Sequence, residues 1–283
     1  MTQGPSIAVT GATGALGGRV AARLAAAGVE QRLVVRDAAR APSLPGADVA
    51  QASYEDTEAM RRAMAGVETV FLVPVGEMQG RVRVHTAAVD AIVAAGVRRI
   101  VYASFLRAAP DATFTFARDH YATEQHIRGT GAEFTFLRES LYLDLAPTWV
   151  GSDGVIRGPA HDGRVAWVSR DDIADVAAAV LTTSGHEGQT YDVTGPVSIS
   201  MAELADELAK FSGRPVRFED ETLEQARASR ASSGAPDWAI EGWVTSYAAV
   251  GTGELDVVSD TVATLAGHPP QTLAEFLHDH PPL

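Results

Sequence analysis

A glycine-rich segment near the start of the chain limits the possible folds more strongly than any other part of the sequence. It reads Gly11-Ala12-Thr13-Gly14-Ala15-Leu16-Gly17 and lies between an apolar segment, residues 7–10, and an Ala/Leu-rich segment, residues 15–27. A strand, a glycine turn and a helix in this order predict that the first-turn amides of the helix face a bound pyrophosphate. The glycines would permit the tight turn, the close approach of the phosphates and the packing of helix on sheet. The alternative is a tight strand–helix turn in an α/β protein that binds no nucleotide.

The rest of the first half continues the same alternation. Apolar strands are expected at residues 32–35, 48–52, 69–73, 99–103 and 134–137, and helices at residues 57–65, 83–95 and 118–128. Strands that are apolar along their whole length and alternate with helices are typical of a parallel sheet covered on both faces. The predicted fold class is therefore α/β, a Rossmann-type doubly wound parallel sheet.

The pattern changes after about residue 140. Strand-like segments at residues 165–168 and 190–193 are mixed with helical segments at residues 171–181, 200–211 and 272–278. We expect an NAD(P)-binding Rossmann domain at residues 1–140 and a smaller C-terminal α/β substrate lobe at residues 141–283, interleaved with the sheet as one compact unit. The Ser/Ala/Gly-rich segment 227–236 is expected to be a mobile loop.

Composition argues against several classes of function. The formal net charge is -13 and no Lys/Arg-rich run is present, which argues against nucleic acid as a partner. The chain has no cysteine, which excludes disulfides and thiolate metal sites, and we expect no metal site. No apolar run approaches the ~20 residues needed to span a bilayer, and the first residues do not resemble a signal peptide. We therefore expect a cytoplasmic protein without a membrane partner.

The residues after the second predicted strand discriminate between nicotinamide cofactors. Arg36 follows that strand, Asp37 comes next, and Arg40 lies one helical turn further on. Arginine accommodates the 2′-phosphate of NADP, whereas a carboxylate binds the ribose 2′-hydroxyl of NAD. The two guanidinium groups favour NADP(H) over NAD(H). Asp37 argues for NAD if it faces the ribose, and is neutral in this choice if it caps a helix.

These motifs resemble those of the atypical short-chain dehydrogenase/reductases of the NmrA-like group, and within it most of all the bacterial NADPH-dependent quinone oxidoreductases of type 2. The resemblance covers nearly the whole chain. It rests on residues 10–17 and 35–37, on Tyr102-Ala103-Ser104, on His120 with Thr123-Glu124, on Arg170-Asp171-Asp172, and on Gly267-His268-Pro269.

The resemblance implies roles for particular positions. It implies cofactor contacts from the glycine turn, from the two arginines and from the segment after the fourth strand, namely Gly11, Thr13, Gly14, Ala15, Leu16, Gly17, Arg36, Arg40, Val73, Pro74 and Val75. Ser104 and Tyr142 would face the substrate. The family often has Asp beside the adenine after the third strand, and Ser53 stands there in this chain, with Tyr54 and Asp56 as the possible replacements.

The catalytic pair of standard short-chain dehydrogenases is missing. These enzymes use Tyr-x-x-x-Lys, in which the lysine lowers the tyrosine pKa from about 10. The nearest match begins at Tyr121 and has Gln125 in place of lysine. The related quinone reductases also lack that tyrosine.

Four residues remain as candidates for the chemistry. Tyr121, His120 and Tyr142 are candidate proton donors, and Ser104 is a candidate for orienting the acceptor oxygen. Three of them also have a structural interpretation: Tyr121 as a packing aromatic, Ser104 as a cap, and His120 as one half of a helix-surface pair with Glu124, four residues further on. Tyr142 follows the sixth predicted strand, where a side chain is expected to face the pocket.

The missing pair narrows the chemistry. Ketone reduction forms a poorly stabilised alkoxide that needs a positioned acid, whereas quinone reduction forms a resonance-stabilised anion that solvent or a weak donor can protonate. Proximity and orientation then supply most of the rate. We therefore expect an NAD(P)H-dependent oxidoreductase, monomeric or homodimeric, that acts on quinones or similar conjugated aromatic acceptors. The alternatives are an NAD(P)-binding redox sensor without turnover and an aromatic natural-product tailoring enzyme that performs oxidation or oxygenation.

Overall fold

The computed structural model describes residues 6–280 and contains eleven strands within them. The strands are β1 (Ile7–Thr10), β2 (Gln31–Val35), β3 (Ala47–Gln51), β4 (Thr69–Leu72), β5 (Arg99–Phe105), β6 (Glu133–Glu139), β7 (Val155–Gly158), β8 (Arg164–Val165), β9 (Gln189–Val193), β10 (Ile199–Ser200) and β11 (Arg217–Asp220). The α-helices are α1 (Ala15–Ala26), α2 (Thr57–Ala63), α3 (Arg81–Ala94), α4 (Thr115–Gly129), α5 (Arg170–Thr182), α6 (Met201–Ser212), α7 (Leu223–Ala231), α8 (Asp237–Gly251) and α9 (Leu273–Asp279).

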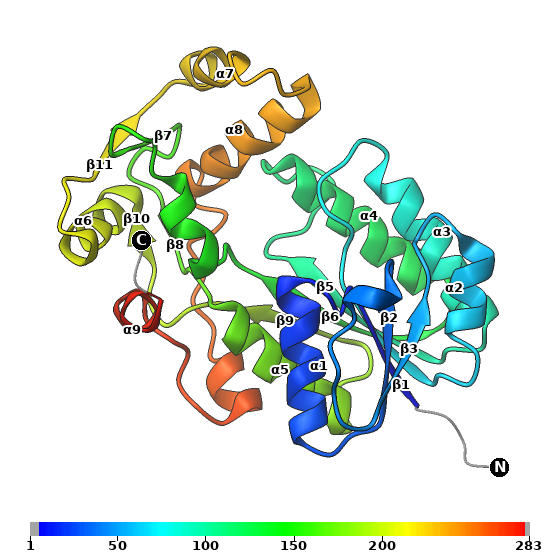
Figure 1. Cartoon of the computed structure of the whole chain (residues 1–283). Helices are drawn as coiled ribbons and strands as arrows, with labels where there is room; N and C mark the ends of the chain where they lie inside the picture. The colour runs from blue at the N-terminus through cyan, green and yellow to red at the C-terminus, as the bar shows by residue number, and fades with distance from the viewer. Residues whose placement is uncertain (1–5, 281–283) are drawn as a thin grey trace. The chain divides into compact units, whose positions relative to one another are not determined.

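Seven strands form one sheet in the order β3-β2-β1-β4-β5-β6-β9 (Figure 1). β1 pairs in parallel with both β2 and β4, β2 with β3, and β4 with β5. The strand order therefore reverses at β1, where successive crossovers leave in opposite directions. Ligands of doubly wound sheets bind outside the carboxyl ends of the strands at such a switch point.

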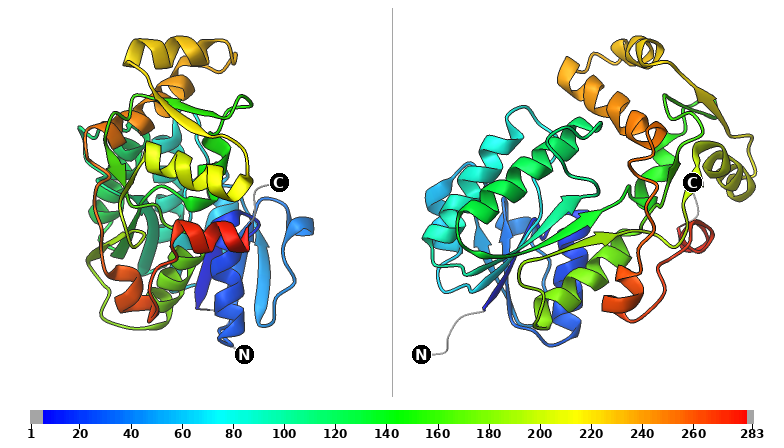
Figure 2. Two further views of the ribbon diagram at one scale, coloured as in Figure 1. Left: turned by 90° about the vertical axis from the view of Figure 1, so that its left-hand side faces the viewer. Right: turned by 180° about the vertical axis from the view of Figure 1, so that it is seen from behind.

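Helices cover both faces of this sheet. α1 and α5 lie on one face, and α2, α3 and α4 lie on the other (Figures 1 and 2). All four residues of β1 are buried, as expected for a strand that is covered on both faces. The core against α2 and α3 contains Met60, Ile92, Ile100 and Phe136. These observations confirm the predicted α/β fold class.

The chain divides into two units that it visits alternately. Within the described residues, the first unit contains residues 6–105, 119–138 and 170–191, and the second contains residues 106–118, 139–169 and 192–280. The sequence pattern predicts a boundary at residue 140. In the structure, residues 106–118 belong to the second unit, and residues 170–191, with α5 and most of β9, belong to the first. The second unit also holds two small sheets, in which β10 pairs antiparallel with β8 and β11 pairs in parallel with β7.

Sequence patterns located the elements of the first half to within three residues, but they were less successful in the second. The strands β7 and β11 and the helix α7 were not predicted. The loop expected at residues 227–236 is wrong for its first five residues, which lie in α7. Thr222 and Gln225 form a capping box at the start of that helix, and Ala226 on it is fully buried.

Among the helices of the described part of the chain, none combines the length and the apolar character needed to cross a membrane.

Candidate cofactor and catalytic site

The glycine turn has the geometry that its sequence predicted. Gly11 adopts a left-handed φ of 61°, and the amide of Gly14 donates to the carbonyl of Gly11 across 2.8 Å. A Cβ added to Gly17 would lie 2.5 Å from the Gly11 oxygen and 2.7 Å from the Thr10 oxygen. Only glycine therefore allows α1 to approach the end of β1 so closely.

The N-terminus of α1 is open to an anion. Gly14 is the N-cap and supplies no side-chain hydrogen bond, and the first turn contains no acidic residue. The first amides of a helix have no partner within the helix and lie at the positive end of its dipole. The turn can therefore bind a phosphate group through its backbone.

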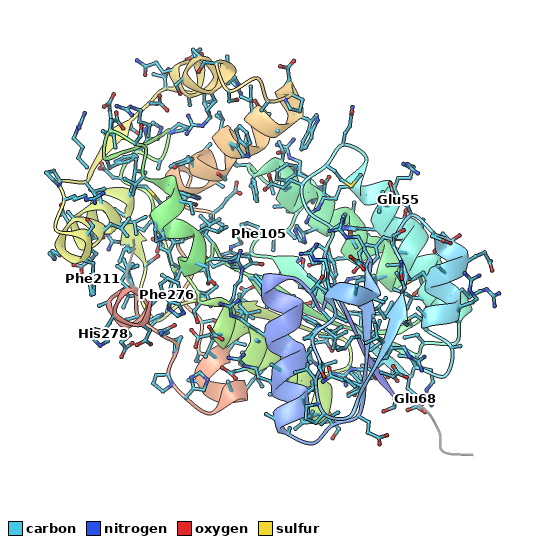
Figure 3. All side chains as sticks on the ribbon, in the orientation of Figure 1. Glu55, Glu68, Phe105, Phe211, Phe276 and His278 are labelled. Atoms are coloured by element: carbon cyan, nitrogen blue, oxygen red, sulfur yellow. The ribbon has the colours of Figure 1, made fainter. Side chains whose placement is uncertain are left out.

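A cavity of about 590 Å³ begins at this turn and extends over the carboxyl ends of β1, β2, β3 and β4. Its lining is Gly11, Thr13, Gly14, Val34, Val35, Arg36, Ala52, Ser53, Tyr54, Glu55, Val73, Pro74, Val75, Gly76, Glu77, Met78 and Val84. In Figure 3, the labelled Glu55 lies at the cavity end of the sheet and Glu68 lies at the opposite end. Of the eleven expected cofactor residues, seven line the cavity, and Ala15, Leu16, Gly17 and Arg40 do not.

The residues after β2 separate into two roles. Arg36 lines the cavity, is exposed, and has no ion pair with any of the described residues. Asp37 accepts a hydrogen bond from the amide of Ala39 at 3.0 Å and so caps the short helix Ala38–Arg40. The structure therefore supports the capping interpretation of Asp37, which leaves the guanidinium of Arg36 available for an anion.

The residues after β3 show which side chain could replace the aspartate that the family often has beside the adenine. Ser53 and Tyr54 both line the cavity. Asp56 does not, because its carboxylate accepts from the amide of Ala59 and caps α2. Of the two possible replacements for the family's aspartate, only Tyr54 lies at the cavity.

The backbone after β4 is held firmly at Val73. The amide of Val73 donates to Thr10 Oγ1 at 2.9 Å, and the hydroxyl of Tyr54 lies 2.5 Å from the Val73 carbonyl and 2.6 Å from Thr10 Oγ1. Burial raises the pKa of Tyr54, so this phenol stays protonated and remains a donor. The wall formed by Val73, Pro74 and Val75 is thus fixed where it leaves the sheet.

Two histidines lie buried behind this wall. His85 Nε2 lies 3.0 Å from the amide nitrogen of Val75, and His85 Nδ1 lies 3.0 Å from Thr123 Oγ1. His120 Nδ1 lies 3.0 Å from the Tyr102 hydroxyl, and His120 Nε2 lies 3.2 Å from a guanidinium nitrogen of Arg81. Both nitrogens of each ring are therefore occupied by neighbouring groups of the protein.

Burial keeps both imidazoles neutral. Desolvation, together with the charge of Arg81, lowers the pKa of His85 to about 3. The same two causes, with a further contribution from His85, hold the pKa of His120 well below its usual value. Burial also raises the pKa of Tyr102. His120, one of the candidate proton donors, is therefore a neutral, hydrogen-bonded core residue.

Ser104 takes part in a second buried network. Its hydroxyl donates to Glu124 Oε1 at 2.6 Å, and Arg138 contacts both carboxylate oxygens, at 2.9 and 2.7 Å. The alternative interpretation, in which His120 and Glu124 pair with each other on the helix surface, is wrong. Although they are four residues apart on α4, one side chain bonds Tyr102 and Arg81 and the other bonds Ser104 and Arg138.

The two tyrosine candidates lie in different units. Tyr121 is on α4 in the first unit, is half-buried, and makes no side-chain hydrogen bond with the residues that the structure describes. Gln125, where a lysine would stand, is exposed on the same helix. Tyr142 belongs to the second unit, where its hydroxyl donates a short hydrogen bond to Glu139 and its backbone bridges to Val168.

No group of three or more His, Asp or Glu side chains within residues 6–280 has the arrangement of a metal site. Sequence reasoning missed Arg81 and the role of His85. They are four residues apart on α3, but nothing local shows that both point toward the segment after β4.

The fold and the site together define the class of protein to which the chain belongs. A doubly wound sheet with a glycine turn at its switch point, and a cavity over the neighbouring strand ends, is the arrangement of Rossmann-type dinucleotide-binding proteins. The NmrA-like family model matches residues 3–277 of the chain. The protein belongs to the NmrA-like family.

Several of the similar proteins are reductases that use a nicotinamide cofactor. The NAD(P)H azoreductase of Xenophilus azovorans is 33% identical over 280 residues, which cover 97% of each chain. The NADPH-dependent quinone oxidoreductase QOR2 of Escherichia coli, in its complex with NADPH, superposes with a TM-score of 0.88 at 34% identity, over 97% of this chain and 99% of that one. The Citrobacter sp. triphenylmethane reductase complexed with NADP(H) superposes with a TM-score of 0.85 at 31% identity, over 97% and 99%.

Proposed function

We propose that this protein is an NADPH-dependent oxidoreductase that transfers a hydride to quinones or similar conjugated aromatic acceptors. The observation that carries the proposal is the cavity that joins the open N-terminus of α1 to Arg36 and to the segment Val73–Val75. Relatives named for a quinone, an azo compound and triphenylmethane dyes support the class of acceptor, because all three are conjugated compounds that can accept a hydride.

The residues present fit NADP(H). The amides of the first turn of α1 suit the pyrophosphate. Arg36 suits the 2′-phosphate because it has no acidic partner among residues 6–280 and presents up to five N–H donors. Val73, Pro74 and Val75 would line the nicotinamide-ribose side. The bound cofactor would supply the hydride.

The chain contributes binding and orientation more than acid catalysis. Ser104 and His120 have their polar atoms engaged within the buried networks. Tyr121 is the remaining candidate in the first unit, and Gln125, four residues further on, cannot supply the positive charge of a catalytic lysine. We infer that Tyr121 is at most a weak proton donor, which suffices for a hydroquinone anion but not for a ketone alkoxide. Tyr142 is proposed to contact the acceptor.

A cofactor oxidation assay tests the function. The protein is mixed with NADPH and a panel of benzoquinones, naphthoquinones, azo dyes and simple ketones, and the absorbance of the reduced nicotinamide is followed. We expect turnover with the conjugated acceptors and none with the ketones. Tight NADPH binding without turnover across the panel would contradict the proposal and support a redox sensor, and oxygen uptake would support oxygenation.

A further inference from the structure

The backbone of Val75 is held at both its N–H and its C=O group by side chains that lie behind the cavity wall. Its amide faces His85 Nε2 at 3.0 Å, and its carbonyl accepts from Arg81 Nε at 3.0 Å. Both side chains come from the first turns of α3 and are buried. Val75 itself lines the cavity, so the two residues act on the wall from the side opposite to the ligand.

The position of the proton on His85 follows from its partners, because one of them is a group that can only donate. The Val75 amide can only donate, so His85 Nε2 is the acceptor. A neutral imidazole carries one proton, which is then on Nδ1 and is donated to Thr123 Oγ1. The Thr123 hydroxyl donates in turn to the carbonyl of Asp119 at 2.9 Å.

The same reasoning applies on the His120 side. Arg81 has no acceptor, so His120 Nε2 accepts from it, and the ring proton on Nδ1 is donated to the oxygen of Tyr102. Two chains of hydrogen bonds therefore start at Val75. One runs through His85 to Thr123, and the other runs through Arg81 and His120 to Tyr102.

We propose that Arg81 and His85 are positioning residues that fix the Val75 peptide, so that the wall Val73–Val75 holds the nicotinamide half of the cofactor in the orientation for hydride transfer. This inference rests on the proposed function. Pro74 has no N–H, and the Val73 amide and carbonyl are engaged by Thr10 and Tyr54. The wall therefore presents mainly apolar side chains to the ligand, and its backbone cannot shift without breaking buried hydrogen bonds.

Loss of the contacts to Val75 should change the rate of hydride transfer more than the affinity for NADPH. The affinity for NADPH is expected to come mainly from the phosphates, at the glycine turn and Arg36, and not from contacts with the Val75 backbone. Misplacement of the reacting groups by about 1 Å costs on the order of 10²-fold in rate. Loosening the Val75 peptide should therefore slow hydride transfer and leave the Kd for NADPH within about threefold of the wild-type value.

Two variants of His85 separate its two contacts. In His85→Gln the side-chain amide reaches the position of Nε2, so its oxygen can accept from Val75, but the bond to Thr123 is lost. In His85→Asn the amide nitrogen takes the position of Nδ1, so the bond to Thr123 is kept and the one to Val75 is lost. His126→Asn, a partly exposed position on α4 that bonds Asp90, is the control.

The experiment measures three quantities for each variant: the single-turnover rate of NADPH oxidation by a quinone, the Kd for NADPH by calorimetry, and the hydrogen exchange rate of the Val75 amide. We expect His85→Asn to slow hydride transfer at least tenfold and to speed Val75 exchange at least tenfold, with Kd little changed. His85→Gln should be at least fivefold closer to the wild type in both rates, and His126→Asn should match the wild type.

Equal effects of the Gln and Asn variants on both rates would overturn the inference, as would fast exchange of the Val75 amide in the wild-type protein. If neither variant folds, the wild-type exchange rate of the Val75 amide still decides whether that amide is held. Failure of the proposed function looks different, because the wild-type protein would then not oxidise NADPH with any acceptor while the exchange rates still ranked the variants as stated.

Discussion

Ser104 donates a hydrogen bond of 2.6 Å to the carboxylate of Glu124, which is fully buried and also binds Arg138 through both oxygens. This places the serine at the end of β5 inside an ion-pair network that joins β5, α4 and β6. Its hydroxyl is therefore engaged within the protein, which gives it a clear role in stability.

We expect Glu124→Ala to destabilise the protein by about 3 kcal/mol, because it leaves a partly buried guanidinium and a buried hydroxyl without their acceptor. Urea unfolding measures the effect. The control is Glu58→Ala, which removes an exposed ion pair with Arg61 on α2 and should cost less than about 1 kcal/mol. Similar losses for the two variants would show that the buried network contributes no more than a surface pair.

Gly17→Ala should be much more harmful than Gly18→Ala. An added Cβ at Gly17 would lie 2.5 Å from a backbone oxygen, whereas at Gly18 the nearest atom is the Ala12 oxygen at 3.1 Å. Overpacking of this kind costs roughly 1–3 kcal/mol, and it would also push α1 away from the turn that binds the pyrophosphate. Thermal unfolding and NADPH titration of the two variants test this, and equal stability and affinity would contradict it.

Arg36→Ala should weaken NADPH binding by roughly 10- to 100-fold and NADH binding by less than threefold, because a charge-assisted bond to the 2′-phosphate contributes about 1.5–3 kcal/mol. Arg40 does not line the cavity, so Arg40→Ala should have the smaller effect. Calorimetric titration with both cofactors is the measurement. Equal weakening of NADPH and NADH would rule out the phosphate contact.

Stability should fall as the pH drops below about 6.5, in part because of His85. Its pKa is 6.5 in the unfolded chain and about 3 in the folded protein, so between these values the unfolded state binds a proton that the folded state does not. Each such group reduces the free energy of unfolding by about 1.4 kcal/mol per pH unit in this window, and it has no effect above pH 6.5. Urea unfolding between pH 6 and pH 4 should therefore show a shallower pH slope for His85→Gln than for the wild type. Identical slopes would mean that folding does not lower the pKa of His85.

Tyr121→Phe should lower the rate of quinone reduction by less than about tenfold, since an essential acid is worth roughly 10²–10⁴-fold. Tyr142→Phe should mainly raise the KM for the acceptor, as expected for a residue that contacts substrate. Steady-state kinetics with one quinone at saturating NADPH separates the two effects. A loss of a hundredfold or more in kcat for Tyr121→Phe would make it a true acid catalyst and contradict the proposed mechanism.

The first half of the fold and the phosphate turn could be predicted because their signals are local. The apolar run before Gly11, the spacing of the three glycines and the Ala-rich helix after them lie within about twenty consecutive residues. In the second half, β7 and β11 pair with each other across more than fifty residues. β11 is largely exposed and lacks an apolar pattern, and β7 has only two apolar residues, Val155 and Ile156, which are too few to predict a strand.

In the candidate site, too, local sequence could place some residues but not others. Arg36 could be assigned because its position directly after β2 places it at the sheet edge whatever the rest of the chain does. The pairing of His120 with Glu124 could not be judged from their spacing, because the choice of partner depended on Tyr102 and Arg81 on one side and on Arg138 on the other.

Local sequence thus accounts for the strand–turn–helix and for the type of ligand that its amides can bind, since backbone geometry and hydrogen-bonding capacity belong to neighbouring residues. The two chains of hydrogen bonds behind Val75 depend on tertiary contacts alone. They join side chains from α3, β5 and α4, and each donor meets its acceptor only because these elements pack together.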